Sequence, residues 1–309
     1  MDTAELLKKV RRIEIKTRRL SSDLFAGEYH SAFKGRGMSF SEVREYQPGD
    51  DIRTIDWNVT ARFHTPFVKV FEEERELTVM LLLDMSPSAF FGSSGQRKND
   101  MIAEISAVLA FAASNNGDKV GALLFTDEVD LFIPPKKGRG HILRILREIL
   151  DFDDIIQERI QKEGKVPGTD IGKALEYFSG VIKKRSIVFL FSDFMASNYD
   201  RPLQISARKH DLVGVHVHDR RERELPDIGL ARVFDSERRN YRWIDTSDAR
   251  LRAGWKVHHD DRRKNFLDTF RRAGSDIIDV ESSIPEEKIR QREYITALHR
   301  FFRKREKRK

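Results

Sequence analysis

One carboxylate and two hydroxyls alternate directly after a strongly apolar segment of this chain. The segment is Leu-Thr-Val-Met-Leu-Leu-Leu at residues 77–83, and Asp84, Ser86 and Ser88 follow it. The apolar run predicts a buried strand, and open α/β sheets bind ligands where parallel strands end. Carboxylate and hydroxyl oxygens suit a hard divalent ion such as Mg²⁺. The spacing therefore favours either a metal site or an ordinary turn in which Asp84 is a helix cap.

This Asp-x-Ser-x-Ser element resembles the metal-ion-dependent adhesion site of von Willebrand factor A-like domains. That site also uses a Thr in a loop before a helix, and then an Asp after a later strand. Thr169 opens an amphipathic segment at 167–175, and Asp193 ends an apolar strand at 187–193. The resemblance implies that the hydroxyls of Ser86, Ser88 and Thr169 bind Mg²⁺ directly. Asp84 and Asp193 would hold it mostly through water, with one position open to an acidic partner residue.

Strands and helices must alternate if these side chains are to meet at one edge. Strands are predicted at 77–83, 120–125, 129–133, 186–192, 212–217 and 276–280, and helices at 97–115, 140–150, 170–183, 201–209, 259–272 and 285–304. This order predicts a doubly wound α/β fold with a mostly parallel sheet covered on both faces. The short turn at 126–128 makes 129–133 an antiparallel edge strand. Alternating apolar residues predict a hairpin at 230–246.

The first 76 residues are predicted to form an N-terminal region ahead of a large domain at 77–309. Residues 3–20 have the pattern of an amphipathic helix whose face carries Leu6, Val10 and Ile13. We expect this face to dock on protein; contact with a membrane surface is the alternative. Residues 33–76 alternate and turn often, which indicates a small strand-and-loop layer.

A long block resembles the signature of the domain-of-unknown-function-58 family. It consists of residues 40–57, with the sequence FSEVREYQPGDDIRTIDW, then Ala61-Arg62 and residues 68–74. The resemblance covers most of the chain and includes the terminal segment LHRFF at 298–302. It implies a von Willebrand factor A-like fold and an association with a MoxR-type AAA+ ATPase. Many relatives carry membrane helices before the signature; this chain shows none, so we expect a soluble, cytoplasmic bacterial protein.

The leading hypothesis is a non-enzymatic, Mg²⁺-dependent protein-interaction module. It would act with the MoxR-type ATPase as an adaptor or chaperone-like factor, and an acidic residue of a client would complete the ion's coordination. The alternative is a metal-dependent hydrolase that uses the same oxygens, because bound Mg²⁺ can also activate water. Asp127 and Asp170 are the candidate bases for that reaction.

Several other patterns favour structural interpretations. His216 and His218 share a face of a predicted strand, but no third metal ligand follows at a convincing spacing. The loop at 92–98 does not match a phosphate loop, and we expect it to be flexible. Ser86 lacks the surroundings of a catalytic nucleophile. The charged residues of the block at 49–57 favour a partly buried ion-pair network that fixes the N-terminal layer against the sheet, with partner docking as the alternative.

Composition limits the classes of function. The 309 residues are 39% hydrophobic and 35% charged, and no run approaches the ~18 apolar residues of a membrane helix. Cysteine is absent, which excludes disulfides and thiolate sites and fits the cytoplasm. The net charge of +7 comes from 57 basic and 50 acidic residues. Because the basic runs lack interleaved aromatic residues, we expect no nucleic-acid partner, and the basic tail at 303–309 should be solvated.

Overall fold

The chain folds as two compact units in the computed structural model. The structure describes residues 3–20, 29, 32–33, 38–63, 65–73, 76–93, 95–164, 166–235, 240–284 and 286–308. The small unit is Phe33–Leu77, and the large unit combines Met1–Ala32 with Thr78–Lys309. The structure differs here from the single N-terminal region expected at 1–76, because the first helix belongs with the large unit.

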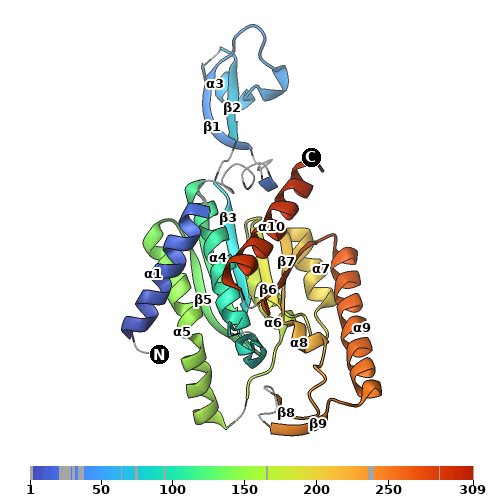
Figure 1. Ribbon diagram of the computed structural model, residues 1–309. Coiled ribbons are helices and arrows are strands. Elements are labelled where there is room, and N and C mark those ends of the chain that lie inside the picture. Colours follow the sequence, from blue (N-terminus) through green and yellow to red (C-terminus); the bar gives the residue numbers. More distant parts are fainter. Residues whose placement is uncertain are drawn as a thin grey trace. The chain divides into compact units, whose positions relative to one another are not determined.

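A six-stranded sheet forms the centre of the large unit (Figure 1). Its order is β10-β7-β6-β3-β4-β5, and each neighbouring pair is parallel except β4 with β5. The strands are β3 (Thr78–Asp84), β4 (Lys119–Phe125), β5 (Val129–Lys136), β6 (Ile187–Ser192), β7 (Asp211–His218) and β10 (Asp276–Glu281). The doubly wound α/β prediction is therefore confirmed, including the antiparallel edge strand.

Helices cover both faces of this sheet. On one face α1 (Thr3–Leu20), α4 (Lys98–Asn115) and α5 (Arg139–Glu163) pack together, and on the other α6 (Ile171–Val181), α7 (Asp200–Lys209) and α9 (Ala249–Ala273) do so. The last helix, α10 (Glu287–Glu306), packs along β10. Both α5 and α9 extend well beyond their predicted ranges. The added turns of α9 begin at Asp248, whose carboxylate accepts hydrogen bonds from the first amides of the helix.

The N-terminal helix docks on α4 and α5. Leu6, Val10 and Ile13 are all buried, as the amphipathic pattern predicts. Ion pairs flank this apolar stripe: Lys16 Nζ lies 2.9 Å from Glu104 Oε2, and Arg139 pairs with Glu14. Within the described residues, no helix combines the length and the apolar character needed to cross a membrane.

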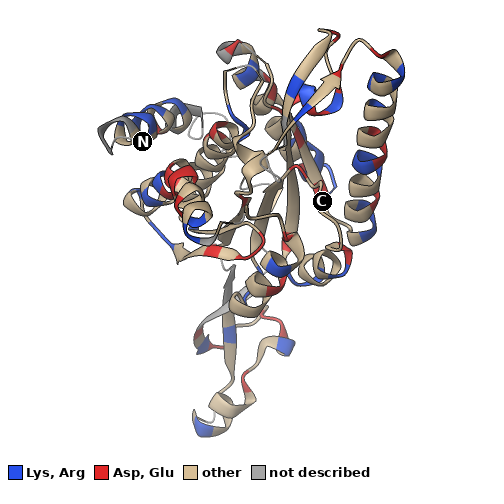
Figure 2. Ribbon diagram, turned by 90° about the horizontal axis from the view of Figure 1, so that it is seen from below, with Lys and Arg blue, Asp and Glu red and all other residues tan. Residues whose placement is uncertain are grey.

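Basic and acidic residues are interspersed along the helices (Figure 2). The hairpin predicted at 230–246 is present as β8 (Leu230–Asp235) and β9 (Asn240–Asp245). A short helix that the sequence did not predict, α8 (Arg220–Arg223), follows β7. It begins with a capping box, in which the side chains of Asp219 and Glu222 each accept a hydrogen bond from the other's backbone amide.

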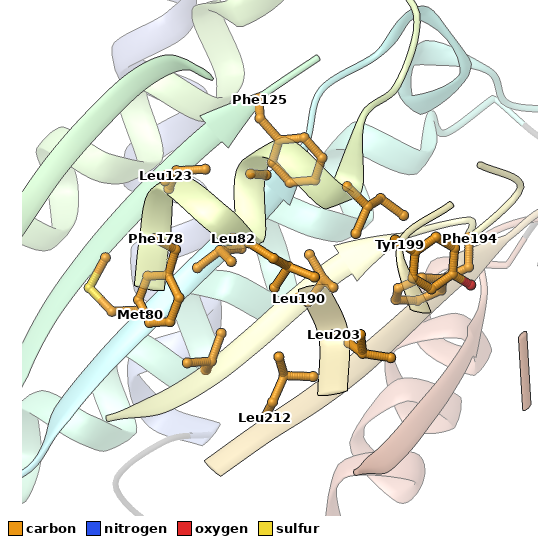
Figure 3. Close-up of a cluster of buried hydrophobic side chains, with 14 of the residues drawn as sticks. Met80, Leu82, Leu123, Phe125, Phe178, Leu190, Phe194, Tyr199, Leu203 and Leu212 are labelled. Carbon is orange, nitrogen blue, oxygen red and sulfur yellow. The ribbon is translucent and has the colours of Figure 1, made fainter. Parts of the chain in front are cut away.

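The core under α6, α7 and α9 is apolar and closely packed (Figure 3). Met80 and Leu82 of β3 pack there with Leu190 of β6 and with Phe178 of α6. The alternate residues of β3, Leu81 and Leu83, are fully buried as well. Burial on both faces explains why the central strands are continuous apolar runs in the sequence.

The small unit contains a two-stranded antiparallel sheet of β1 (Met38–Glu45) and β2 (Phe67–Glu73), with η2 (Ile52–Thr54) and α3 (Trp57–Phe63) between them. Arg44 holds Asp50 through two hydrogen bonds of 2.8 and 2.7 Å. Asp56 accepts from two amides at the start of α3, and Lys69 pairs with it. These signature charges are therefore paired inside the small unit itself.

Candidate functional site

Four of the five predicted ligand residues meet where β3 and β6 end. Asp84 Oδ1 accepts a hydrogen bond from the Ser86 amide at 3.1 Å, and the Ser86 and Ser88 hydroxyl oxygens are also 3.1 Å apart. Asp193 follows β6, and its negative charge acts on Asp84. The parallel pairing of β3 with β6 brings these residues together.

Thr169 is the fifth predicted ligand, and it lies on the loop that leads into α6. The neighbouring Asp170 caps this helix and donates its amide to the Thr126 carbonyl, 2.9 Å away beyond the end of β4. A small cavity at the site is lined by Asp84, Ser88, Ala89, Lys98, Ile102, Ser192, Asp193 and Val217. Thr169 is half-buried and does not line this cavity, so its role as a ligand stays a prediction.

The ammonium group of Lys98 lies inside the site. Its Nζ is 3.0 Å from Asp193 Oδ2 and 2.6 Å from Glu222 Oε1, and the side chain is only 2% exposed. Lys98 comes from the first turn of α4, and Glu222 comes from α8, after β7. The site therefore contains a cation that belongs to the protein itself.

The charges of this cluster shift the acidities of its members. Burial and the charge of Asp193 raise the pKa of Asp84 to about 6, although hydrogen bonds from Ser192 and Ser86 oppose the shift. Burial also acts to raise the pKa of Asp193, but the ammonium of Lys98 outweighs it and lowers that pKa to about 2. Burial acts to lower the pKa of Lys98, yet its two carboxylate partners raise it. Lys98 thus stays protonated at neutral pH.

The arrangement does not fit a hydrated Mg²⁺. The cavity measures about 10 Å³, which is about the space of one water molecule. Mg²⁺ requires six oxygen ligands and usually retains several waters. Lys98 already binds the carboxylate of Asp193, so an ion would have to displace it. One ammonium nevertheless faces the three carboxylates of Asp84, Asp193 and Glu222, and this excess of negative charge still attracts cations.

The loop after β3 is tied to the end of β7. Ser93 donates its amide and its hydroxyl to the carboxylate of Asp219, at 2.8 and 2.7 Å. Gly92 packs so closely on Gln96 that a β-carbon at position 92 would lie 2.1 Å from the Gln96 carbonyl oxygen. Over its described residues this loop is fixed by contacts, which differs from the flexible loop expected at 92–98.

Comparison with known proteins places the chain in a family. The family model described as "Protein of unknown function DUF58" matches residues 42–265. The chain belongs to the DUF58 family. Uncharacterized protein Rv1480 of Mycobacterium tuberculosis (strain ATCC 25618 / H37Rv) is 32% identical over 238 residues, which cover 77% of this chain and 73% of that protein. Uncharacterized protein YeaD of Bacillus subtilis (strain 168) is 28% identical over 109 residues, covering 35% of this chain and 25% of that protein.

Solved structures show more distant likenesses to this DUF58 protein. An aerotolerance-related membrane protein from Bacteroides fragilis NCTC 9343 has a TM-score of 0.44 and 14% identity, covering 71% of this chain and 98% of that one. The conserved hypothetical protein BatB from Bacteroides thetaiotaomicron has a TM-score of 0.41 and 14% identity, covering 72% and 98%. Likenesses this distant say nothing about function.

Sequence reasoning missed Lys98 and Glu222. Lys98 falls on the helical stripe that also carries Ile102, Ile105 and Leu109, all of them buried. A lysine in register with an apolar stripe is a signal for a buried, paired ammonium. Glu222 offered no comparable signal, because its position in a capping box already accounts for it.

Neither residue considered as a hydrolytic base is free at this site of the DUF58 protein. Asp127 Oδ1 lies 3.0 Å from the Arg159 guanidinium. Asp170 Oδ1 accepts the Lys173 amide at 2.9 Å as the cap of α6. Neither residue lines the cavity that contains Lys98. Both carboxylates therefore have structural roles, and they give the hydrolase alternative no support.

Proposed function

We propose that this DUF58 protein is a protein-interaction module that acts with a MoxR-type AAA+ ATPase as an adaptor or chaperone-like factor. The choice of ATPase follows from the family resemblance of the signature block at 40–57, 61–62 and 68–74. A cytoplasmic location is part of the same proposal.

The small size of the cavity around Asp84, Lys98 and Asp193 is the observation that supports this proposal. Its cavity of about 10 Å³ has no room for a nucleotide, peptide or phosphoester, whereas small-molecule sites usually measure hundreds of Å³. The buried ammonium of Lys98 is already bound by Asp193 and Glu222. The oxygen cluster around Lys98 can therefore act on a partner through its surface more readily than on a substrate in a pocket.

Exposed apolar residues of the small unit supply a contact surface for the partner. Ile52 and Trp57 are each 69% exposed, and Phe63 is 64% exposed. All three lie on η2 and α3, and Ile52 and Trp57 belong to the signature block. Large exposed apolar side chains favour protein contacts, and Trp is enriched among residues that dominate binding energy. We propose this surface as the place where the ATPase docks.

The expected Mg²⁺ enters this proposal only as a competitor of Lys98. The site's negative excess favours a dication, but Mg²⁺ can bind only after the Lys98 ammonium has left Asp193. An acidic client residue, expected to complete the coordination of the ion, would likewise compete with Asp193 and Glu222 for Lys98. Metal dependence of partner binding is therefore expected to be weak while Lys98 is present.

Binding to the MoxR-type ATPase of the same organism tests the proposal. The purified full-length chain should bind the purified ATPase in biolayer interferometry, and Trp57→Ala should weaken binding at least about tenfold, because hot-spot truncations cost ~2 kcal/mol. Trp243→Ala is the matched control, since Trp243 is 64% exposed on β9 of the large unit. Absence of binding would contradict the proposal. Turnover of a phosphoester, nucleotide or peptide by the pure chain, abolished by Asp84→Ala, would establish the hydrolase instead.

A further inference from the structure

A second polar cluster lies at the same edge of the sheet, on β7 and β10. His216 and His218 share a face of β7, and Asp279 is the register partner of His216 on β10. His216 Nδ1 lies 2.6 Å from Asp279 Oδ1, and His218 Nε2 lies 3.3 Å from the same oxygen. One potential ligand atom from each residue lies within 4.8 Å of the other two. Two imidazoles and a carboxylate thus converge on one point.

The side of helix α9 that faces the sheet changes from apolar to polar residues at this cluster. Phe266 and Phe270 pack into the apolar core, whereas His259 and Arg263, one to two turns earlier on the same side, line a pocket with the two histidines. His259 is only 6% exposed, and in the described part of the chain its Nδ1 has no hydrogen-bond partner. A buried polar atom without a partner is destabilising, so a ligand at this position would remove that cost.

The pocket has room for an ion and for water. It measures about 420 Å³, and besides the three histidines and Asp279 it is lined by residues of α10 and of the end of β10. This volume contrasts with the cavity of about 10 Å³ around Lys98. A bound ion here could retain an open coordination position, as three-ligand sites do.

We propose that His216, His218 and Asp279 bind a divalent transition metal of the Zn²⁺ class, with His259 facing the fourth position. Imidazole nitrogen and carboxylate oxygen are the ligands that Zn²⁺ takes in such sites, and imidazole suits transition metals better than Mg²⁺. This site is separate from the oxygen cluster at Asp84, and it does not depend on the partner-binding proposal.

Neighbouring residues orient the three proposed ligands and affect their protonation. Arg263 pairs with Oδ2 of Asp279, which orients the carboxylate and leaves Oδ1 to the histidines, as outer partners of metal ligands commonly do. Arg223 also lines the pocket, and its charge is paired with Asp260 at 2.8 Å. Burial lowers the pKa of His216, and burial with the neighbouring histidines lowers that of His259 to about 4. Burial thus favours the neutral form of His216 and His259, the form that binds metal.

Metal binding requires only a small adjustment of this geometry. Ligand atoms of a tetrahedral zinc site lie roughly 3.4 Å apart, given bonds of ~2.1 Å. The contact between His218 and Asp279 already matches this spacing at 3.3 Å. The 2.6 Å contact between His216 and Asp279 must open by about 1 Å. The ion would replace the proton that this hydrogen bond shares.

Zinc titration of the full-length chain, without an affinity tag and after treatment with a chelator, tests this site. Calorimetry at pH 7 should show one saturable site, and Co²⁺ should give the visible absorption of a four-coordinate ion. His218→Ala should weaken Zn²⁺ binding at least about tenfold, since even outer partners of metal ligands contribute 10–100-fold. The His218 side chain is 22% exposed, so the variant should fold. The Zn²⁺ affinity of Asp279→Asn provides a second test of the same site.

His258→Ala is the matched control. His258 neighbours His259 in sequence but is exposed on the outer side of α9, so its removal should leave the Zn²⁺ affinity unchanged. Wild-type protein that shows no saturable binding below about 100 μM Zn²⁺ would overturn the proposal, because two imidazoles and a carboxylate form a strong ligand set for this ion. A His218→Ala variant that binds as tightly as wild type would also overturn it.

Discussion

A buried lysine needs carboxylate partners to remain charged, and Lys98 has two. Taking an ammonium out of water costs several kcal/mol, which only close and well-directed opposite charges can offset. Asp193 and Glu222 lie at 3.0 and 2.6 Å and supply this compensation from two different strand ends. Lys98 therefore links the loops after β6 and β7 to the first turn of α4.

Lys98→Met should lower the free energy of unfolding by about 3–5 kcal/mol at pH 7, because it leaves buried carboxylates without their counter-charge. Millimolar Mg²⁺ should then raise the thermal midpoint of this variant while leaving that of the wild type nearly unchanged. Urea unfolding and thermal scans with Mg²⁺ or EDTA measure both effects. Arg97→Met is the matched control: its side chain is 56% exposed, so the loss should stay below about 1 kcal/mol. An equal Mg²⁺ response in wild type and variant would show that Lys98 does not block the ion.

His210 should make the protein sensitive to mild acid. It is 1% exposed, and neither of its ring nitrogens has a partner among the described residues. Burial, together with the charges of Lys209 and Arg185, lowers its pKa to about 4. Because the unfolded chain takes up this proton near pH 6.5, the stabilisation is complete above pH 6.5 and declines as the pH falls toward 4.

Wild-type protein should therefore lose up to about 3 kcal/mol from this residue between pH 6.5 and 4. His210→Leu removes the titrating group, so its urea-unfolding free energy should fall less steeply over the same range. Equal slopes in the two proteins would show that His210 does not titrate on unfolding.

Among the elements, β7 and α9 pack closely at Gly214. A β-carbon on Gly214 would lie 2.5 Å from Cε1 of Phe270, so β7 needs glycine for this helix to pack. Gly214→Ala should lower the free energy of unfolding by about 1–3 kcal/mol through overpacking. Gly180→Ala is the control: Gly180 lies exposed on α6 with open space at its β-position, so alanine there should add about 0.5–1 kcal/mol. Urea unfolding of both variants measures these changes. If Gly214→Ala left the free energy of unfolding unchanged, α9 would be shown to shift and accommodate the added methyl group.

Strands were easier to predict than helix ends, for a physical reason. The inner strands are buried on both faces and must be apolar throughout, so each appears in the sequence as a continuous apolar run. The first half of α9 is largely exposed, so no apolar periodicity marks it. Its start depends on Asp248 as a cap, and single capping residues occur equally in turns.

At the scale of the whole molecule, the sequence showed which residues gather at the sheet edge but not which charges meet there. Strand order and strand ends place Asp84 and Asp193 together, and both follow from local patterns. Lys98 and Glu222 reach the site from separate helices, and their pairing depends on packing that no local pattern encodes. For the same reason Asp279, far along the chain from His216 and His218, was not recognised as their partner.

The strand order of the sheet also bears on how the chain folds during synthesis. The central strand β3 is made first, and each later strand joins one already made: β4 beside β3, β5 beside β4, β6 beside β3, β7 beside β6 and β10 beside β7. Domains can begin to fold while the ribosome is still extending them, and this sheet can grow outward without rearranging earlier pairs. Until β10 emerges, β7 is an open edge able to pair with other chains. The last strand, β10, thus covers the edge of β7, and the histidine cluster is completed in the same last step.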